Sequence, residues 1–230
     1  MLAGEVRVSA DVPTAYAEIV AGEMERTKPL RNDTPFRLAA SGGNSGSACC
    51  RALAASTAVD FSSINLFFVD ERCVEAGSPD LNSVAISNAL GEYQAILAGF
   101  HPMSCSSGAA SYEEELRRAG GLDLVQLGLG PDGHTASLFP SSAALEEHDA
   151  LVCSNIDPSG NNAHERLTLT YRGIALAPLV VITVIGQARA DVVRAIADGG
   201  DYPAARVRAE RLIWLIDTAA APLHEGTSDA

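Results

Sequence analysis

The sequence predicts an α/β fold with a mostly parallel sheet and helices on both faces. Short apolar runs of strand length alternate along the chain with segments whose apolar residues recur at helical spacing. Such alternation is typical of parallel sheets built from β–α–β units. Glycine-rich or charged segments directly follow several of the runs, at the end of a strand where α/β proteins bind their ligands.

The apolar runs and the periodic segments give the expected elements in order. Strands are expected over 36–40, 64–69, 122–127, 150–154, 166–170, 179–185 and 211–217. Helices are expected over 12–26, 47–55, 82–97, 112–118 and 188–197, with a short helical piece over 203–209. No internal repeat or linker interrupts this pattern. We therefore expect one domain over 1–221 and a disordered tail over 222–230.

Composition excludes several classes of protein. The formal net charge of −13 does not suit a general nucleic-acid binder, which carries a basic face. No apolar run approaches the length of about 18 residues that a membrane span needs, and no secretory signal opens the chain. We expect a cytoplasmic protein, a monomer or small homo-oligomer, with no nucleic-acid or membrane partner. An anionic ligand must then be bound locally by a few arginines and backbone amides.

The five cysteines are odd in number and lack CxxC spacing. This pattern favours reduced thiols over a disulfide framework or a zinc site. Cys73 follows Arg72, which could lower its pKa, but a small core residue is the preferred interpretation.

A glycine-rich turn that carries a histidine follows the run over 122–127. The segment Gly128–His134 reads Gly-Leu-Gly-Pro-Asp-Gly-His. A histidine titrates near neutral pH, and this one sits at the expected carboxyl end of a parallel strand. The Gly-x-Gly-x-x-Gly spacing also matches a dinucleotide-binding fingerprint. Pro140 follows too soon for the helix that the fingerprint requires, so we disfavour a nicotinamide or flavin site.

A second glycine-rich loop has the sequence expected of an anion site. Ser41–Gly46 reads Ser-Gly-Gly-Asn-Ser-Gly and lies between a predicted strand and a predicted helix. Backbone N–H groups and the positive end of the helix dipole both face such a loop. An ordinary turn is the alternative interpretation, and the Gly-Lys-Ser/Thr ending of a P-loop is absent.

Charged residues complete the pattern. Asp70-Glu71-Arg72 directly follows the strand over 64–69, and Arg189 lies in the first turn of a predicted helix, where a cation opposes the helix dipole unless an anion is near. A solvated strand end and a surface arginine are the alternatives. Together with the two loops, these residues predict acid–base chemistry on a small phosphorylated substrate, with His134 as the base.

The segment Gly128–Pro140 resembles a signature of the glucosamine-6-phosphate isomerase/6-phosphogluconolactonase family. It reads Gly-x-Gly-x-Asp-Gly-His-Thr-Ala-Ser-Leu-Phe-Pro, and this ending is similar to that of the lactonases. The deaminases of the superfamily continue after Gly-His with a run of the type Ile-Ala-Phe-Asn-Glu-Pro. Further similar motifs are Ser41-Gly42-Gly43, Asp70-Glu71-Arg72 with Asp80 and Asn82, Arg166-x-Thr168-x-Thr170 and Gly186-x-x-Arg189-Ala190.

This resemblance implies a Rossmann-like three-layer sandwich. It also implies hydrolysis of 6-phospho-D-glucono-1,5-lactone to 6-phospho-D-gluconate in the oxidative pentose phosphate pathway, without metal or organic cofactor. His134 would activate water, Asp132 would shape the turn or orient His134, and Arg72 would bind the phosphate or stabilise the oxyanion. The implied substrate-binding residues are Ser41, Gly42, Gly43, Asn44, Asp70, Arg166 and Arg189.

Two departures from the family pattern affect the phosphate site. The loop continues as Asn44-Ser45-Gly46 where the family usually has Ser or Thr and then Pro, and Arg189 replaces the usual lysine. The charge at position 189 is kept, although a planar guanidinium binds phosphate differently from an ammonium. Two alternative functions stay open: a sugar-phosphate deaminase or isomerase, and a non-catalytic sugar-phosphate sensor.

Overall fold

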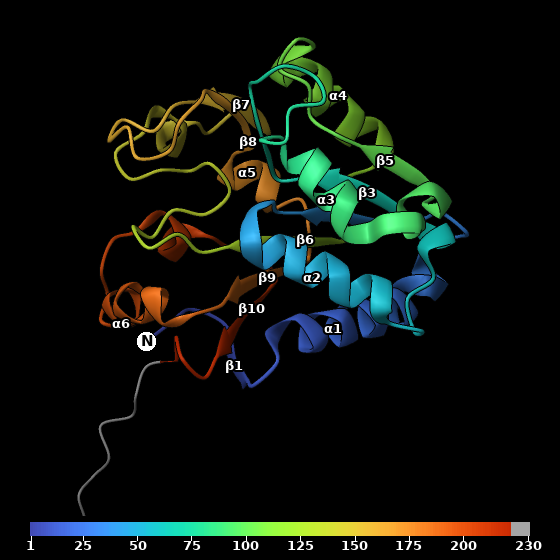
Figure 1. Cartoon of the computed structure of the whole chain (residues 1–230), viewed down its shortest axis with the longest axis horizontal. Coiled ribbons are helices and arrows are strands. Elements are labelled where there is room, and N and C mark those ends of the chain that lie inside the picture. The colour runs from blue at the N-terminus through green and yellow to red at the C-terminus, as the bar shows by residue number, and fades with distance from the viewer. Residues whose placement is uncertain (222–230) are drawn as a thin grey trace, which may run out of the picture.

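A parallel sheet forms the centre of the molecule. The structure, a computed structural model, describes residues 1–221. The sheet has seven strands in the order β1-β10-β9-β6-β2-β3-β5, and every neighbouring pair is parallel (Figure 1). The strands are β1 Glu5–Ser9, β2 Phe36–Ala40, β3 Ile64–Phe68, β5 Gly99–His101, β6 Leu124–Gly128, β9 Leu179–Val184 and β10 Arg211–Asp217.

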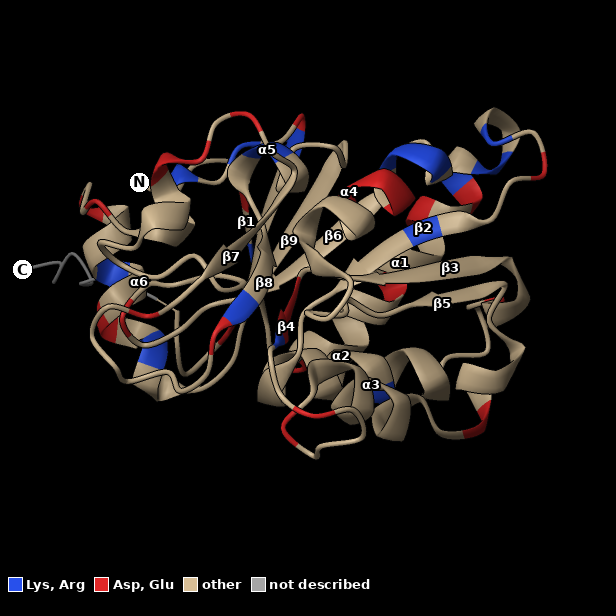
Figure 2. Cartoon of the chain, turned by 90° about the horizontal axis from the view of Figure 1, so that it is seen from above, with Lys and Arg blue, Asp and Glu red and all other residues tan. Residues whose placement is uncertain are grey.

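Helices cover both faces of this sheet, as predicted. Helices α1, α2 and α3 pack together on one face, while α4 and α5 lie on the other (Figure 2). The helices are α1 Val12–Thr27, α2 Gly43–Ala55, α3 Asn82–Leu90, α4 Gly108–Ala119, α5 Tyr171–Ile174 and α6 Ala190–Ala197. Short 3₁₀ turns span Lys28–Leu30, Phe61–Ser63, Gly91–Ile96, Ala143–Glu146, Gln187–Arg189 and Pro203–Arg206. Among the described residues, no helix is both long and apolar enough to cross a bilayer.

The strand β9 lies inside the core, since all six of its residues are buried. The run Leu-Val-Val-Ile-Thr-Val suits a central parallel strand, because β-branched side chains pack well on a sheet covered on both faces. On the neighbouring strand, Trp214 is buried and its indole N–H donates to the Ala3 carbonyl at 3.0 Å.

A second, antiparallel sheet of three strands has the order β4-β8-β7. Its strands are β4 Asp70–Arg72, β7 Val152–Asn155 and β8 Arg166–Leu169. Val69 joins the two sheets, because its N–H donates to the Ala40 carbonyl at 3.1 Å and its carbonyl accepts from Leu169 N at 2.8 Å. Asp70-Glu71-Arg72 is thus a strand of this second sheet as well as the continuation of β3.

Four helices differ from their predicted bounds by more than one residue. α6 begins at Ala190 rather than at 188, so Arg189 lies in the 3₁₀ turn that precedes the helix and not in its first turn. α2 begins at Gly43, so most of the glycine loop forms its first turn. α4 begins at Gly108, ahead of the predicted start. The helix predicted over 82–97 ends at Leu90, because Gly91 adopts φ +59° and a 3₁₀ turn follows. The tail predicted over 222–230 lies outside the described residues.

The prediction that all cysteines are reduced thiols is wrong for two of them. Cys73 and Cys105 form a disulfide with a Cα–Cα distance of 5.4 Å. The two residues lie 32 positions apart, and the fold brings the end of β4 beside the segment that follows β5. Sequence spacing does not show this proximity. Cys49, Cys50 and Cys153 are free, and burial raises the pKa of the first two to about 12.

Candidate active site

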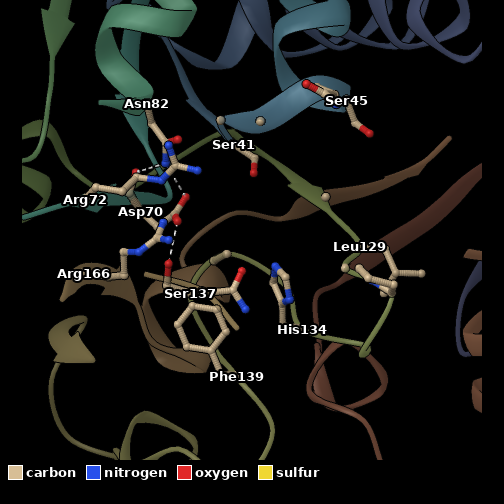
Figure 3. Close-up of a pocket in the computed structure, with 18 of the residues that line it drawn as sticks. Ser41, Ser45, Asp70, Arg72, Asn82, Leu129, His134, Ser137, Phe139 and Arg166 are labelled. Carbon is tan, nitrogen blue, oxygen red and sulfur yellow. Dashed lines mark hydrogen bonds between the residues drawn. The ribbon is translucent and has the colours of Figure 1, made fainter. Parts of the chain in front are cut away.

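A cleft of about 290 Å³ lies at the carboxyl ends of the central strands. Every predicted site residue except Asp132 lines it (Figure 3). The lining comprises Ser41, Gly42, Gly43, Asn44, Ser45, Asp70, Arg72, Asn82, Gly128, Leu129, Gly130, Pro131, His134, Ala136, Ser137, Phe139, Asn162, Arg166 and Arg189.

The amino end of α2 forms one wall of the cleft. Among the described side chains none caps this helix end, so backbone N–H groups of its first turn are available to an anion. Ser41 precedes the helix, and its N–H donates to Gln126 Oε1 at 2.8 Å. Gly42 must be glycine, since the Asn82 side chain occupies the place of a Cβ. The structure therefore places the predicted anion loop at a helix start, as its sequence indicated.

His134 stands on a tight turn opposite this helix end. Its Nδ1 lies 2.6 Å from Asp132 Oδ1, and its carbonyl accepts from Gly130 N at 2.9 Å. Gly133 adopts φ +81°, and the Tyr202 ring packs where its Cβ would be. The imidazole meets the Phe139 ring edge-on at 5.2 Å between centroids. Four local contacts thus fix the turn, and the ring points into the cleft (Figure 3).

Asp132 contacts the imidazole but does not line the cleft. Burial alone would raise the pKa of Asp132, but the hydrogen bond and the charge of His134 outweigh it, so that pKa lies below its ordinary value. An ionised Asp132 carboxylate accepts a hydrogen bond from the Nδ1–H group of His134. In the neutral imidazole this leaves Nε2 with a free lone pair. The carboxylate therefore fixes the orientation of the imidazole.

Arg72 and Arg166 form a cationic group at one end of the cleft (Figure 3). Arg72 donates to the Asp80 carbonyl at 2.6 Å, and its Nε is buried without a described partner. Arg166 donates from Nε and one terminal nitrogen to the Ala163 carbonyl. Burial and then the charge of Arg72 lower the pKa of Arg166. Both guanidiniums keep N–H groups for an anion.

Arg189 supplies a cation at a different place. The Nε atom of Arg189 lies 3.4 Å from the Leu129 carbonyl oxygen. In Figure 3, His134 lies between Leu129 on one side and the arginines Arg72 and Arg166 on the other. The cleft therefore presents cations on both sides of the histidine. A ligand with negative charge at one end and a polar reacting group at the other fits this distribution.

Four polar residues of the cleft were absent from the predicted site. Ser45, Asn82 and Ser137 stood within the quoted motifs but carried no assigned role, and Asn162 belongs to a turn that gave no signal of its own. Glu71, by contrast, is structural: its carboxylate accepts the N–H groups of Asn82 and Ser83 at 2.6 and 2.8 Å and so caps α3.

This fold and this cleft define an α/β protein whose central strands end at a cleft lined by a helix N-terminus, three arginines and a histidine. The chain belongs to the family described as glucosamine-6-phosphate isomerases/6-phosphogluconolactonase, whose model matches residues 9–214. The family predicted from the motifs is thereby confirmed, and so is the Rossmann-like three-layer architecture.

The chain is similar in sequence and in structure to several proteins of known name. A 6-phosphogluconolactonase of Synechocystis sp. is 35% identical over 210 residues, covering 83% of this chain and 85% of that protein. The crystal structure of a 6-phosphogluconolactonase from Thermotoga maritima matches with TM-score 0.77 and 26% identity, covering 92% of this chain and 97% of the other. A monomeric glucosamine-6-phosphate deaminase matches with TM-score 0.76 at 15% identity, over 94% and 98% of the two chains. That last similarity shows only that the fold is shared.

Proposed function

We propose that this chain hydrolyses 6-phospho-D-glucono-1,5-lactone to 6-phospho-D-gluconate, a step of the oxidative pentose phosphate pathway. The observation that carries the proposal is the His134–Asp132 pair, set between cationic groups in a cleft open at the sheet edge. The names of the relatives agree with this reaction. The lactone has a phosphate at one end and an electrophilic carbonyl at the other, which matches the distribution of charge in the cleft.

In the proposed mechanism, His134 acts as general base. Its cleft-facing nitrogen takes a proton from water, the resulting hydroxide attacks the lactone carbonyl, and Asp132 stabilises the imidazolium that forms. Collapse of the tetrahedral intermediate releases the ring oxygen, which receives the proton from His134. General-base assistance of this kind contributes about 10² to 10⁴ in rate. The hydrolysis requires no redox or organic cofactor.

The anionic end of the substrate is proposed to lie on the N–H groups of Ser41–Asn44. Arg166 and Arg189 are the proposed charged partners, and because they lie on opposite sides of His134, one is proposed to pair with the phosphate and the other with the oxygen atoms of the lactone. Asp70 completes the proposed substrate-binding residues. Arg72 has two proposed uses: it binds the phosphate or stabilises the developing oxyanion. For Arg72→Met, a rise in KM with kcat unchanged indicates the phosphate, and an equal loss in kcat and kcat/KM indicates the oxyanion.

The proposed location is the cytoplasm, and the proposed partner is the small phosphorylated lactone alone, bound by a monomer or small homo-oligomer. The charge of −13 supports the exclusion of nucleic acid. The Cys73–Cys105 disulfide argues against a strongly reducing compartment, so the redox state of this cysteine pair in the isolated protein tests the proposed location.

The test is hydrolysis of freshly prepared lactone, coupled to 6-phosphogluconate dehydrogenase and read as the excess over the spontaneous rate. We expect turnover by the native chain and a fall in kcat of about 10² to 10⁴ for His134→Asn. Binding of 6-phosphogluconate, followed by calorimetry, should survive that substitution. No excess rate at micromolar native protein would overturn the proposal.

The same preparations should be assayed on glucosamine 6-phosphate and ribose 5-phosphate, because the fold is shared with a deaminase. Deamination or isomerisation requires a base at a substrate carbon, whereas lactone hydrolysis requires one at water. Turnover of either sugar phosphate without lactone hydrolysis would assign the deaminase or isomerase alternative. Binding that is unaffected by His134→Asn, without any turnover, would assign a sensor.

A further inference from the structure

Ser137 lies three residues after His134 and is bonded to all three strands of the second sheet. Its hydroxyl donates to Asp70 Oδ2 at 2.6 Å and its N–H donates to Thr168 Oγ1 at 3.1 Å. Its carbonyl accepts from Asn155 Nδ2 at 2.7 Å. With 1% of its surface exposed, Ser137 is enclosed, so these bonds are shielded from competition with water.

Asp70 extends this connection toward the anion loop. Its second carboxylate oxygen accepts from Asn82 Nδ2 at 3.1 Å, and the same amide donates to the Asp70 carbonyl at 3.0 Å (Figure 3). The Asn82 side chain then packs directly against Gly42. A buried polar chain therefore runs from Gly42 through Asn82 and Asp70 to Ser137, and we call it the Asn82–Asp70–Ser137 chain.

This chain joins the two parts of the cleft that must act together. The anion loop belongs to β2 and α2, the histidine turn follows β6, and the chain bridges them from the ends of β4 and α3. His134 is fixed on its other side by Asp132 and by Gly130. The bond from Ser137 to Asp70 is short and buried, so it fixes the distance between the histidine turn and the Asp70 carboxylate closely.

We propose that Ser137 is a positioning residue, which sets the place of His134 relative to the anion loop through the Asn82–Asp70–Ser137 chain. The inference rests on the proposed lactonase function. Ser137 acts on the rate through His134, since general-base catalysis falls steeply when the base is displaced by a fraction of an ångström. Loss of its hydroxyl should reduce kcat while the anion site still binds substrate.

A double-mutant cycle tests this role. We expect Ser137→Ala to lower kcat about tenfold with KM within about twofold of native. In the His134→Asn background, Ser137→Ala should cause no further loss of kcat, because residues that act as one unit are not additive. Ser142→Ala is the matched control: Ser142 is buried and bonded to Asn155 at 2.9 Å, and it has no bond to Asp70. This control should stay within twofold of native kcat.

Several results would overturn the inference. These are a change confined to KM, multiplicative losses in the double variant, or an equal loss for Ser142→Ala. If Ser137→Ala does not fold by circular dichroism, Ser137→Cys replaces it, with a weak S–H donor and the same expected pattern. Absence of hydrolysis by the native protein would instead overturn the proposed function, so the two failures are distinguishable.

Discussion

Arg72 and Arg166 are direct partners in the antiparallel β4–β8 ladder, and both side chains line the cleft. Like charges placed opposite each other on a sheet are destabilising, and burial adds to the cost for Arg166, which is only 7% exposed. The carboxylates of Asp70, Glu71 and Asp157 offset this cost only in part, since the pKa of Arg166 remains lowered. We expect an anion bound between the two guanidiniums to reduce the repulsion, so that ligand binding and stability are coupled.

Arg166→Met should separate these two effects. We expect the melting temperature of the empty protein to stay constant or to rise by about 2–4 °C, as for a gain of about 1 kcal/mol in a chain of this size. In the native protein 6-phosphogluconate should raise the melting temperature, and in the variant this rise should largely disappear. Thermal melts with and without ligand measure both. A marked destabilisation of the empty variant, with ligand response intact, would refute the expectation.

Asp157 predicts a pH-dependent contribution to stability. Burial alone would raise its pKa, but hydrogen bonds from Ser159 and Asn162, each through both backbone and side chain at 2.7–2.9 Å, hold the pKa well below its ordinary value. A carboxyl with a lowered folded pKa stabilises the protein above its unfolded pKa, about 3.9, and loses this effect as pH falls toward the folded pKa.

Asp157→Asn should therefore lower the free energy of unfolding by about 1–3 kcal/mol at pH 7. The difference from native should hold down to about pH 5 and should shrink below about pH 4, where the unfolded native carboxyl is protonated. Urea unfolding at several pH values measures it. A difference that grows on acidification contradicts the assignment.

The sequence patterns that located the site are the same ones that located the strands. β2 and β10 have their predicted bounds, because each is an apolar run closed by turn residues. The glycine-rich loops and the charged residues of the site directly follow strands in the sequence. In a parallel sheet the carboxyl ends of the strands lie at one edge, so these residues come together there. Most of the cleft could therefore be predicted without knowledge of any tertiary contact.

The elements that were missed depend on partners distant in the chain. β1 has mostly exposed residues and no apolar run, and it is a strand because β10 pairs with it. β4 has three charged residues, and its place in a second sheet is set by β8. Ser137 gave no signal as a single residue, since its importance comes from strands that assemble around it.

The Cys73–Cys105 disulfide determines how many cysteines of the protein react as free thiols. Denatured without reductant, the protein should react with three equivalents of a thiol reagent, corresponding to Cys49, Cys50 and Cys153. With reductant, all five cysteines should react. Cys73→Ser should lower the free energy of unfolding by about 3–4 kcal/mol for a loop closed over a sequence separation of 32, while the control Cys153→Ser should change it little. Five reactive thiols without reductant would show that the bond does not form.

Gly130 predicts a specific loss of catalysis. A Cβ there would lie 2.7 Å from Asp132 Oδ1 and would also meet the His134 ring. Gly130→Ala should therefore displace the pair and lower kcat about 10²-fold, because a misplacement of about 1 Å has an effect of that size. Gly22→Ala is the control, since its Cβ would meet nothing within 4 Å and alanine favours the α1 helix. Native kcat in Gly130→Ala would contradict the geometry.

The pairing of β1 with β10 has a consequence for how the protein is made. During synthesis β1 leaves the ribosome before the other strands of the sheet, whereas its neighbour among the described strands, Arg211–Asp217, is the last of them to emerge. Until Arg211–Asp217 emerges, Val6 and Val8 belong to a segment without a strand partner. The apolar face of α1 also lacks its contacts with β9 and β10 until those strands have been synthesised. Closure of the sheet is therefore a late, long-range event, and the nascent chain is most open to chaperones or to aggregation just before it.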